Sequence, residues 1–317
     1  MRMMAIRLLR VVLVGACVAM AGPAGAQAPG SQPAAAPAQP DFSKVEIKTT
    51  KIGSNLYELE GQGGNIGVLV GPDGAFMVDS QFAPLSEKIA AAIRQISDGR
   101  IRFVVNTHVH GDHTGGNDNF ARMGATIVAR DELRARLAQP PPAANGTPVR
   151  PPPPAALPML TYRGRVTIHM NGEDVELIAV PVAHTDGDTL VRFPVADVLM
   201  TGDYFRSVGY PNIDRANGGT LKGLLEGLNT TIELAGPNTR VLPGHGAITD
   251  RNGVMAHRDV IIAIRDRVSR LIQQGKTSEE VVASKPTSDY DARVPGGATG
   301  QPDRFVGQLY AELKGGR

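Results

Sequence analysis

Hydrophobic residues alternate with polar ones, or form short runs, along the first part of the chain. Three such runs, at residues 56–59, 66–70 and 75–78, are separated by glycine-containing turns and predict β-strands. A helical spacing of apolar residues begins near Pro84. Proline at this position also indicates a helix start, since proline suits the first turn of a helix. The apolar run at 101–105 predicts a further strand, which ends immediately before a polar segment rich in histidine.

The remaining pattern predicts further strands and helices. We expect a strand at 126–129 and a helix at 131–137, then a hairpin of strands 166–170 and 175–180 with an Asn171-Gly172 turn. Two strands follow at 190–193 and 198–200. Helices are expected at 221–234, at 254–273 and from Thr277, where Thr277 and Glu280 can form a capping box. Eight prolines within 140–154 exclude a helix or strand there and predict an exposed insertion. Strands followed by helices, repeated twice, predict an α+β protein with two packed sheets and helices outside.

Residues 1–26 have the pattern of a secretory signal peptide. Arginines accompany an apolar run, and Ala24-Gly25-Ala26 follows as a small-residue cleavage site. We therefore expect cleavage at the end of this segment and a periplasmic or secreted mature protein. Residues 27–41 are rich in alanine and proline and predict a linker. The folded domain is then expected at 42–317, including C-terminal helices from about residue 254.

Composition and charge narrow the classes of function. The chain has 317 residues, 42% of them hydrophobic, which is enough for a sizeable core. Its formal charge of +2 becomes about −1 without the signal segment, so we expect no nucleic-acid partner. No apolar run approaches the roughly 20 residues of a membrane span. The single cysteine, Cys17, lies in the signal segment, which excludes thiolate metal ligands from the mature protein.

The segment NTHVHGDHTGGN, residues 106–117, concentrates candidate metal ligands. It holds three of the seven histidines together with an aspartate: His108, His110, Asp112 and His113. Imidazole and carboxylate are the side chains that bind a borderline cation such as Zn²⁺. The segment follows a predicted strand, and a loop at a strand end can hold several ligands in fixed geometry. It therefore predicts half of a metal site.

Three further candidate ligands occur downstream. His184, Asp203 and His245 each follow a predicted strand, where a sheet can deliver them to one common edge. The other two histidines differ, because His169 lies within the predicted hairpin and His257 lies on a polar helix face. For these two we expect an ordinary surface or hydrogen-bonded role rather than metal binding.

This ligand set resembles that of the metallo-β-lactamase superfamily over residues 42–246. The resemblance implies a four-layer αβ/βα sandwich with two Zn²⁺ ions per chain at one edge of the sheets. It implies that one ion is held by His108, His110 and His184. The other ion would be held by Asp112, His113 and His245, and Asp203 would bridge the two ions. Asp79 matches a further family motif and is expected to orient a ligand.

The resemblance also implies hydrolysis of a small-molecule substrate. A hydroxide bridging the two zinc ions would attack the substrate, with Asp112 and Asp203 as the catalytic carboxylates. Secreted zinc β-lactamases have a cysteine in place of Asp203, whereas glyoxalase II and lactonases resemble this chain in having aspartate. Arg206 stands where those lactamases have a lysine that receives the substrate carboxylate. We therefore expect cleavage of an amide, ester, lactone or thioester, with β-lactams among the candidates.

Two alternatives share much of this ligand set. A mono-iron enzyme resembling persulfide dioxygenases would use similar residues for redox chemistry, and metal analysis would distinguish it. A non-catalytic metal-binding or relay protein of the periplasm would hold the ions without turnover. The native metal, the substrate and the oligomeric state are left open by the sequence.

Overall fold

The computed structural model describes residues 41–143, 145–296 and 301–315. The expected signal peptide at 1–26 and all but the last residue of the expected linker at 27–41 lie outside the described residues. None of the helices in the described ranges combines the length and the hydropathy needed to cross a lipid bilayer.

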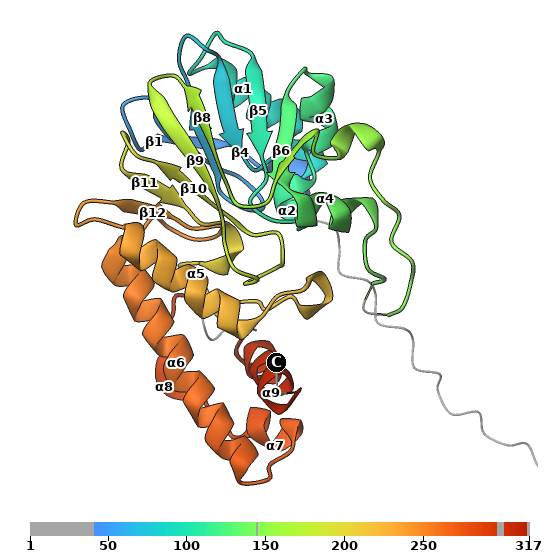
Figure 1. The fold of residues 1–317 in the computed structure, drawn as a ribbon, viewed down its shortest axis with the longest axis vertical. Helices are drawn as coiled ribbons and strands as arrows, with labels where there is room; N and C mark the ends of the chain where they lie inside the picture. The colour runs from blue at the N-terminus through green and yellow to red at the C-terminus, as the bar shows by residue number, and fades with distance from the viewer. Residues whose placement is uncertain (1–40, 144, 297–300, 316–317) are drawn as a thin grey trace, which may run out of the picture. The chain divides into compact units, whose positions relative to one another are not determined.

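Seven strands form the first sheet, in the same order in space as along the chain (Figure 1). They are β1 (Lys48–Lys51), β2 (Leu56–Glu60), β3 (Ile66–Leu69), β4 (Ala75–Val78), β5 (Ile101–Val105), β6 (Thr126–Arg130) and β7 (Leu160–Tyr162). Strands β1 to β4 pair antiparallel because short turns join them. Strands β4 to β7 pair parallel, since long connections containing helices separate them along the chain.

Five strands form the second sheet, in the order β12-β11-β10-β9-β8. They are β8 (Arg165–Met170), β9 (Glu173–Ala179), β10 (Thr189–Phe193), β11 (Val198–Met200) and β12 (Arg240–Leu242). The hairpin of β8 and β9 turns at Asn171-Gly172, as expected from this dipeptide. Both turn residues have positive φ, 55° for Asn171 and 80° for Gly172, which the favoured two-residue hairpin turn requires.

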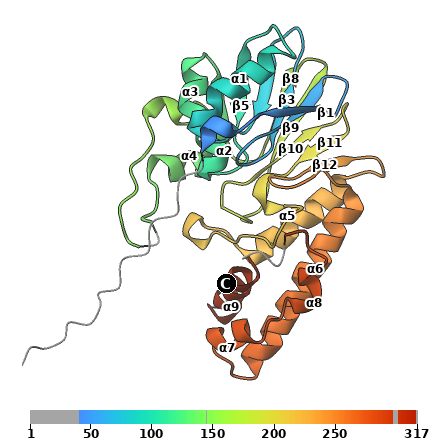
Figure 2. The same cartoon turned by 180° about the vertical axis from the view of Figure 1, so that it is seen from behind.

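Helices cover the outer face of each sheet (Figures 1 and 2). On the first sheet they are α1 (Ser86–Arg94) and α3 (Asn117–Arg122), and on the second it is α5 (Leu221–Leu234). Helix α6 (Arg251–Gln273) packs against α5, and α9 (Pro302–Gly315) packs against α6, farther from the sheet. Side chains of both sheets, including Phe76 and Met200, fill the core between them. These layers form the four-layer αβ/βα sandwich that was expected. The short helices are α2 (Gly111–Thr114), α4 (Asp131–Ala138), α7 (Ser278–Ala283) and α8 (Ser288–Asp291).

Most predicted elements are present with small differences at their ends. Helix α7 begins with the expected capping box, in which Thr277 and Glu280 each bond the other's backbone N–H. Strands β1 and β7 and helix α9 were not predicted, because β1 is polar and largely exposed and β7 has only three residues. The described part of the 140–154 insertion contains no strand, and a single 3-10 turn at Pro154–Ala156 begins at its last residue.

Strand pairing brings the polar ends of four strands to one edge of the sandwich. Parallel pairing of β4 with β5 places Asp79 beside the histidine segment that follows β5. Parallel pairing of β11 with β12 places the segment that carries Asp203 beside the segment that carries His245. Asp79 has a φ of 63°, a left-handed conformation that is uncommon for a non-glycine residue and occurs at many functional sites.

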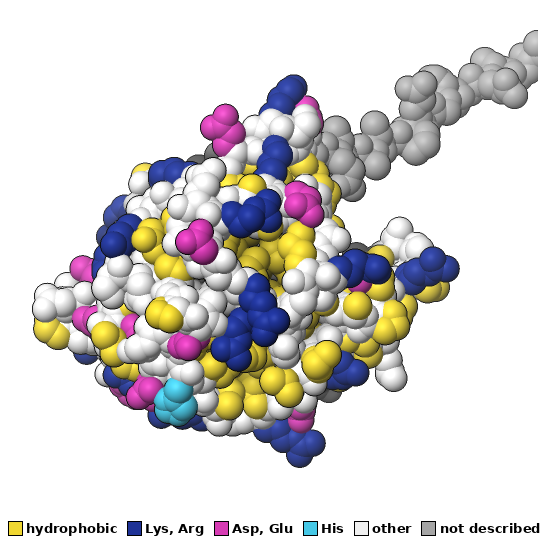
Figure 3. All heavy atoms as spheres, turned by 90° about the horizontal axis from the view of Figure 1, so that it is seen from above, with side chains coloured by type: hydrophobic (Ala, Val, Ile, Leu, Met, Phe, Trp, Pro, Cys, Tyr) yellow, Lys and Arg dark blue, Asp and Glu magenta, His cyan; other side chains and the backbone are white. Residues whose placement is uncertain are grey.

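The face of the molecule opposite this edge has mixed polarity. Seen from above in Figure 3, Lys and Arg side chains are interspersed with Asp and Glu side chains and with hydrophobic ones. This face therefore differs from the basic stripe that binding to a nucleic-acid backbone requires.

Candidate metal centre

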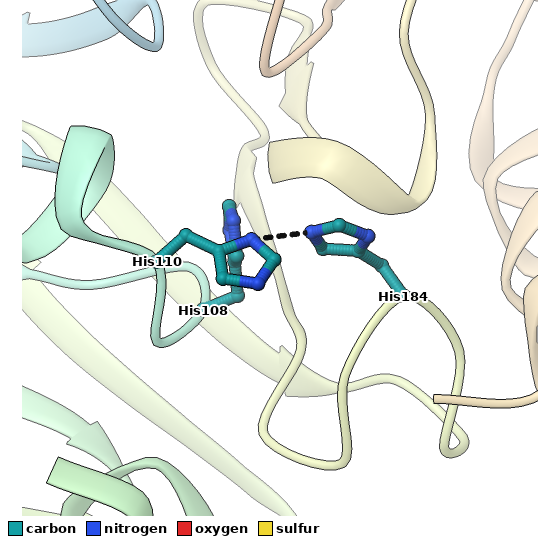
Figure 4. A group of neighbouring side chains, drawn as sticks. All are labelled: His108, His110 and His184. Carbon is teal, nitrogen blue, oxygen red and sulfur yellow. Dashed lines mark hydrogen bonds between the residues drawn. The ribbon is translucent and has the colours of Figure 1, made fainter. Parts of the chain in front are cut away.

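Three histidines from two segments form the first group of candidate ligands. His108 and His110 come from the loop after β5, and His184 comes from the loop between β9 and β10 (Figure 4). One ring nitrogen of each lies within 4.8 Å of the others. His110 Nδ1 and His184 Nε2 are 2.9 Å apart. The three rings therefore face a common point, as ligands of one ion must.

The outward-facing nitrogen of each ring contacts an oxygen. His108 Nδ1 lies 3.1 Å from Thr107 Oγ1, and His110 Nε2 lies 2.6 Å from Asp214 Oδ2. His184 Nδ1 donates to the backbone carbonyl of Asn212 at 2.6 Å. Contacts of this kind fix the tautomer and the orientation of a metal-binding histidine. They leave the inner nitrogen of each ring with a lone pair directed at the common point.

Asp112, His113 and His245 form the second group of candidate ligands. His245 Nε2 lies 3.1 Å from Asp112 Oδ2 and 3.4 Å from His113 Nε2. His113 Nδ1 donates to Asp79 Oδ2 at 2.7 Å, which leaves Nε2 facing the group. Asp79 also accepts hydrogen bonds from the backbone N–H and the hydroxyl of Thr107, both at 2.7 Å. Asp79 therefore orients His113 and anchors the histidine segment.

Asp203 lies between the two groups. Its carboxylate oxygens are 3.2 Å from His113 Nε2, 3.3 Å from His245 Nε2 and 3.9 Å from His184 Nε2. Close approach of the backbone permits this position, because a Cβ at Gly244 would lie 2.0 Å from Asp203 Oδ1. One carboxylate thus faces ligands of both groups, as a residue bridging two ions must.

The residues present fit a pair of metal ions. His108 Nε2 is buried and has no hydrogen-bond partner. The inner nitrogens of His110 and His184 lie 2.9 Å apart, and a cation held by both would take the place of the proton that they share. Burying unpaired polar atoms costs about 1–3 kcal/mol each. Imidazole and carboxylate donors match zinc in ligand type, so the cluster is accounted for by metal binding.

Burial keeps two of the histidines in the neutral state that a metal ligand requires. It lowers the pKa of His108 well below its usual value and that of His184 to about 4. For His113 burial acts in the same direction, but the carboxylates of Asp79 and Asp203 overcome it and raise the pKa. A metal ion would therefore displace a proton from His113 when it binds.

The carboxylates of the centre are ionised at neutral pH. Burial opposes the charge of Asp112, but a hydrogen bond from His245 and the charge of His113 prevail and lower its pKa to about 2. Burial likewise opposes the charge of Asp203, and His113 and His245 lower its pKa well below the usual value. Two ionised carboxylates among neutral and cationic imidazoles suit a site for divalent cations.

The centre is open on one side. The side chains of His113 and His184 are 0% and 1% exposed, whereas those of His110, Asp112 and His245 are 26%, 27% and 19% exposed. A closed structural site would bury all of its ligands, whereas a catalytic site keeps a position free for water or substrate. The exposure therefore favours a catalytic centre.

Arg206 lies close to the centre, three residues beyond Asp203. Its Nε is buried and has no hydrogen-bond partner. On α9, partial burial and the charge of Arg206 lower the pKa of Arg304, and the charge of Asp203 opposes that shift. A bound anion would stabilise both guanidinium groups, which otherwise repel each other.

The structure brings all seven sequence-predicted ligands together and places Asp79 against His113. His169 and His257, which we did not expect to bind metal, differ in their surroundings. His169 is exposed and lies 2.6 Å from Asp174, as expected for a surface residue. The surface or hydrogen-bonded role expected for His257 is not observed, because its Nε2 is buried without a hydrogen-bond partner and its ring packs edge-on against Phe205. That His257 does not bind metal stays a prediction. Burial lowers the pKa of His257 to about 4, so the ring is neutral.

Four residues near the centre were missed by the sequence analysis. Thr107, Asn212 and Asp214 contact the outer nitrogens of the three-histidine group. Asp188 accepts hydrogen bonds from the backbone N–H and the hydroxyl of Thr185 and thereby shapes the loop that carries His184. The HTDGDT pattern was a signal for Asp188, but no motif marked Asn212 or Asp214.

Comparison with known proteins agrees with this geometry. The family model of the metallo-beta-lactamase superfamily matches residues 59–251. A hydroxyacylglutathione hydrolase from Nitrosococcus oceani is 26% identical over 185 residues, which are 56% of this chain and 60% of that protein. The chain thus matches less than two thirds of the length of this relative.

Solved structures share the fold at low sequence identity. The DIM-1 metallo-beta-lactamase superposes with a TM-score of 0.56 at 19% identity, covering 68% of this chain and 97% of its own. A metallo-beta-lactamase from Pontibacter korlensis has a TM-score of 0.56 at 18% identity, and the match covers 68% of this chain and 99% of that protein. The sec-alkylsulfatase Pisa1 from Pseudomonas sp. has a TM-score of 0.61 at 16% identity, and the match covers 85% of this chain and 50% of that protein.

Proposed function

The chain belongs to the metallo-β-lactamase superfamily and is a metal-dependent hydrolase, and we propose that it uses two zinc ions to cleave an ester, thioester, lactone or amide. The observation that carries this proposal is the position of Asp203, whose carboxylate lies 3.2 Å from His113 Nε2 and 3.9 Å from His184 Nε2. A carboxylate that faces both ligand groups can bind an ion in each of them, which supports a pair of ions.

Seven side chains would hold the two ions. The first ion would have His108, His110 and His184 as ligands, the second would have Asp112, His113 and His245, and Asp203 would bind both. When bound, such ions act as Lewis acids and lower the pKa of water toward 7. The neutral state of His108 and His184 supports their part in this assignment.

Asp112 and Asp203 are the proposed catalytic carboxylates. Asp112 is partly exposed, and its pKa of about 2 keeps it ionised at neutral pH. An ionised carboxylate at the open side of the centre can accept a hydrogen bond from the attacking water and hold that water in line with the scissile bond. Asp203 holds the ligand groups together and is too buried to contact the substrate directly.

Arg206 is the proposed receptor for an anionic group of the substrate. Its unpartnered Nε and the nearby Arg304 support this role, because a substrate carboxylate would satisfy a buried donor and reduce the repulsion between the two cations. An ester or thioester that carries a carboxylate fits this arrangement. The similarity to a hydroxyacylglutathione hydrolase supports an acylated thiol among the substrates.

The cellular location and the domain limits are also part of the proposal. We propose that residues 1–26 direct the chain to the periplasm or outside the cell, and that 27–41 link this segment to the hydrolase domain. Helices α5, α6 and α9 pack into one hydrophobic cluster with the second sheet, which supports a single domain from residue 42 onward.

Hydrolysis assays with a matched pair of variants test the proposed function. The wild type and His110→Ala and His169→Ala variants would be assayed on a thioester, a lactone and a β-lactam. We expect His110→Ala to lose at least a hundredfold of the rate on the preferred substrate, because it removes a metal ligand. His169→Ala should retain full activity, since that side chain is exposed and distant in sequence from the ligands. Equal activity of all three proteins would contradict the proposal.

A further inference from the structure

The segment of residues 212–214 contacts the three-histidine group from its outer side. The backbone carbonyl of Asn212 accepts a hydrogen bond from His184 Nδ1 at 2.6 Å, and the backbone N–H of Asp214 donates to the carbonyl of His184 at 3.0 Å. The Asp214 carboxylate also lies 2.6 Å from His110 Nε2. The position of this segment therefore affects two of the three candidate ligands of the first ion.

A glutamine of the C-terminal helix α9 binds this segment. Gln308 Nε2 donates to Asn212 Oδ1 at 2.7 Å, and Gln308 Oε1 accepts from the backbone N–H of Ile213 at 3.1 Å. The donor and the acceptor of one side-chain amide are thus both used, on two adjacent residues. This pairing holds both the side chain of Asn212 and the backbone that follows it.

The peptide unit between Asn212 and Ile213 connects Gln308 to the metal ligand. The carbonyl that accepts from His184 and the N–H that donates to Gln308 belong to this single unit, which is trans. A trans peptide unit is planar, and its C=O and N–H point in opposite directions. Because the N–H is bound to Gln308 on one side, the carbonyl faces His184 on the other. Rotation of the plane would break both hydrogen bonds, so Gln308 holds the acceptor that orients His184.

Packing fixes the helix that carries Gln308. Phe305, one turn before it, is fully buried in the same hydrophobic cluster as Ile213. One turn after it, Glu312 Oε1 accepts a hydrogen bond from the backbone N–H of Leu221, the first residue of α5. The main chain of α9 is therefore anchored on both sides of Gln308.

The second ligand group is oriented by a different part of the fold. His113 Nδ1 donates to Asp79 Oδ2 at 2.7 Å. Asp79 follows β4 of the first sheet, whereas Gln308 lies on the C-terminal helix. Removal of the Gln308 amide should therefore disturb the first group and leave the orientation of His113 unchanged.

We propose that Gln308 is a positioning residue of the metal centre, which aims the Asn212 carbonyl at His184 and thereby maintains the site of the first ion. With Nδ1–H bound to that carbonyl, His184 directs Nε2 to the centre. Gln308 acts on the ligand through one peptide unit. This inference rests on the proposed function, which assigns His184 to the first ion.

The zinc affinity of matched variants tests the inference. Gln308→Met keeps the length of the side chain and removes both hydrogen bonds, so it should weaken the binding of one ion about tenfold and change that of the other by less than about twofold. Gln273→Met, at the exposed end of α6, is the control and should leave both affinities unchanged. Competition with a chromogenic chelator measures both affinities in the full chain. Equal weakening of both ions, or of neither, would overturn the inference.

Two further variants separate positioning from a general loss of structure. Gln308→Glu retains an acceptor for the Ile213 N–H, and a rotated Asn212 amide can donate to the other oxygen, so zinc affinity should stay within about threefold of the wild type. In a His184→Ala background, Gln308→Met should change zinc affinity by less than about twofold, because the ring that it positions is absent. An equal loss in Gln308→Glu and Gln308→Met, or an undiminished effect without His184, would contradict the positioning role.

NMR spectroscopy of the metal-free protein separates this inference from the proposed function. With isotope-labelled histidine, the Nδ1–H of His184 should exchange slowly with water in the wild type and about tenfold faster in Gln308→Met. If the wild type binds a single ion or hydrolyses no substrate but this difference persists, the proposed function fails and the positioning role stands. Two bound ions and hydrolysis, with the same exchange rate in both proteins, would overturn the inference alone.

Discussion

At the scale of single residues, the orientation of the metal ligands depends on side chains that would not touch the metal. Asp214 is the clearest case, because its Oδ2 lies 2.6 Å from His110 Nε2 and also accepts a hydrogen bond from Asn217 at 2.7 Å. Held in this way, His110 can direct only Nδ1 to the centre. Such contacts raise the basicity of a ligand and reduce the entropy that it loses on binding.

Replacing Asp214 tests this role. We expect Asp214→Ala to weaken zinc binding about 10- to 100-fold, because His110 loses its orientation and its preferred tautomer. Asp174→Ala removes an exposed Asp–His contact with the same 2.6 Å distance and should leave zinc affinity unchanged. Competition with a chromogenic chelator measures both affinities. Equal affinities of the two variants would contradict the positioning role.

Glu58 on β2 predicts a pH-dependent stability that is separate from the metal centre. The residue is 6% exposed, and burial together with the charge of Glu60 raises its pKa to about 7. A raised carboxyl pKa means that the folded state holds its proton more tightly than the unfolded state does. The free energy of unfolding should therefore fall as the pH rises from about 4.5 toward 7.

The corresponding variant is Glu58→Gln. It should be more stable than the wild type by about 2 kcal/mol at pH 8 and similar to it at pH 4, because the amide cannot ionise. Urea unfolding at both pH values measures the difference. Glu46→Gln is the control, since that side chain is exposed and its replacement should change stability by less than about 0.5 kcal/mol. A Glu58→Gln variant that gains nothing at pH 8 would show that Glu58 is stabilised in its charged form.

The sequence predicted residues with chemical motifs and missed those whose role comes from the path of the chain. The seven ligand positions and Asp79 follow predicted strands in a recognisable spacing. Asp214 is 104 residues from His110, and the backbone carbonyl of Asn212 carries no side-chain signal at all. Only the folded loop between Asp203 and α5 brings these groups to the histidines.

At the scale of elements, the site depends on strand ends and on backbone close approach. The expected bounds of β4, β5, β11 and α5 agree with the structure, because their apolar runs are continuous or strongly periodic. Arg304 on helix α9 interacts electrostatically with Asp203, yet no pattern in the sequence linked the C-terminal segment to the site. Amphipathic periodicity shows which face of a helix is buried but not which partner covers it.

Gly244, at the end of β12, tests the backbone approach. A Cβ at this position would lie 2.0 Å from Asp203 Oδ1, so Gly244→Ala must displace either the bridging carboxylate or the loop. We expect a loss of stability of about 1–3 kcal/mol and a large loss of activity. Gly164→Ala, where nothing lies within 4 Å of the added Cβ, should change stability by less than about 0.5 kcal/mol. Urea unfolding and turnover of both variants provide the comparison.

At the scale of the whole domain, the metal centre connects the two sheets. His108, His110 and His113 follow a strand of the first sheet, whereas Asp203 and His245 come from segments at the ends of strands of the second. The candidate ligands converge only when the sandwich has assembled, so we expect metal binding and folding to be coupled. This coupling could not be predicted in detail, because the sequence does not specify how the sheets are aligned.

Removal of the metal should therefore destabilise the domain. An ion present at 1,000 times its dissociation constant adds about 4 kcal/mol to the free energy of unfolding. We expect the melting temperature to fall by several degrees when a chelator is added and to recover when zinc is restored. Differential scanning calorimetry measures the change. A melting temperature that is unaffected by complete removal of the metal would show that the ligands are held in place without it.

The number and identity of bound metal ions test the central claim most directly. Elemental analysis of the purified protein, together with protein quantification, gives the metal content per chain. Two zinc ions per chain, reduced in Asp203→Ala, are expected if the bridging carboxylate joins two ligand groups. A single iron ion per chain, unchanged by added zinc, would contradict the binuclear hydrolase and favour redox chemistry at the same residues.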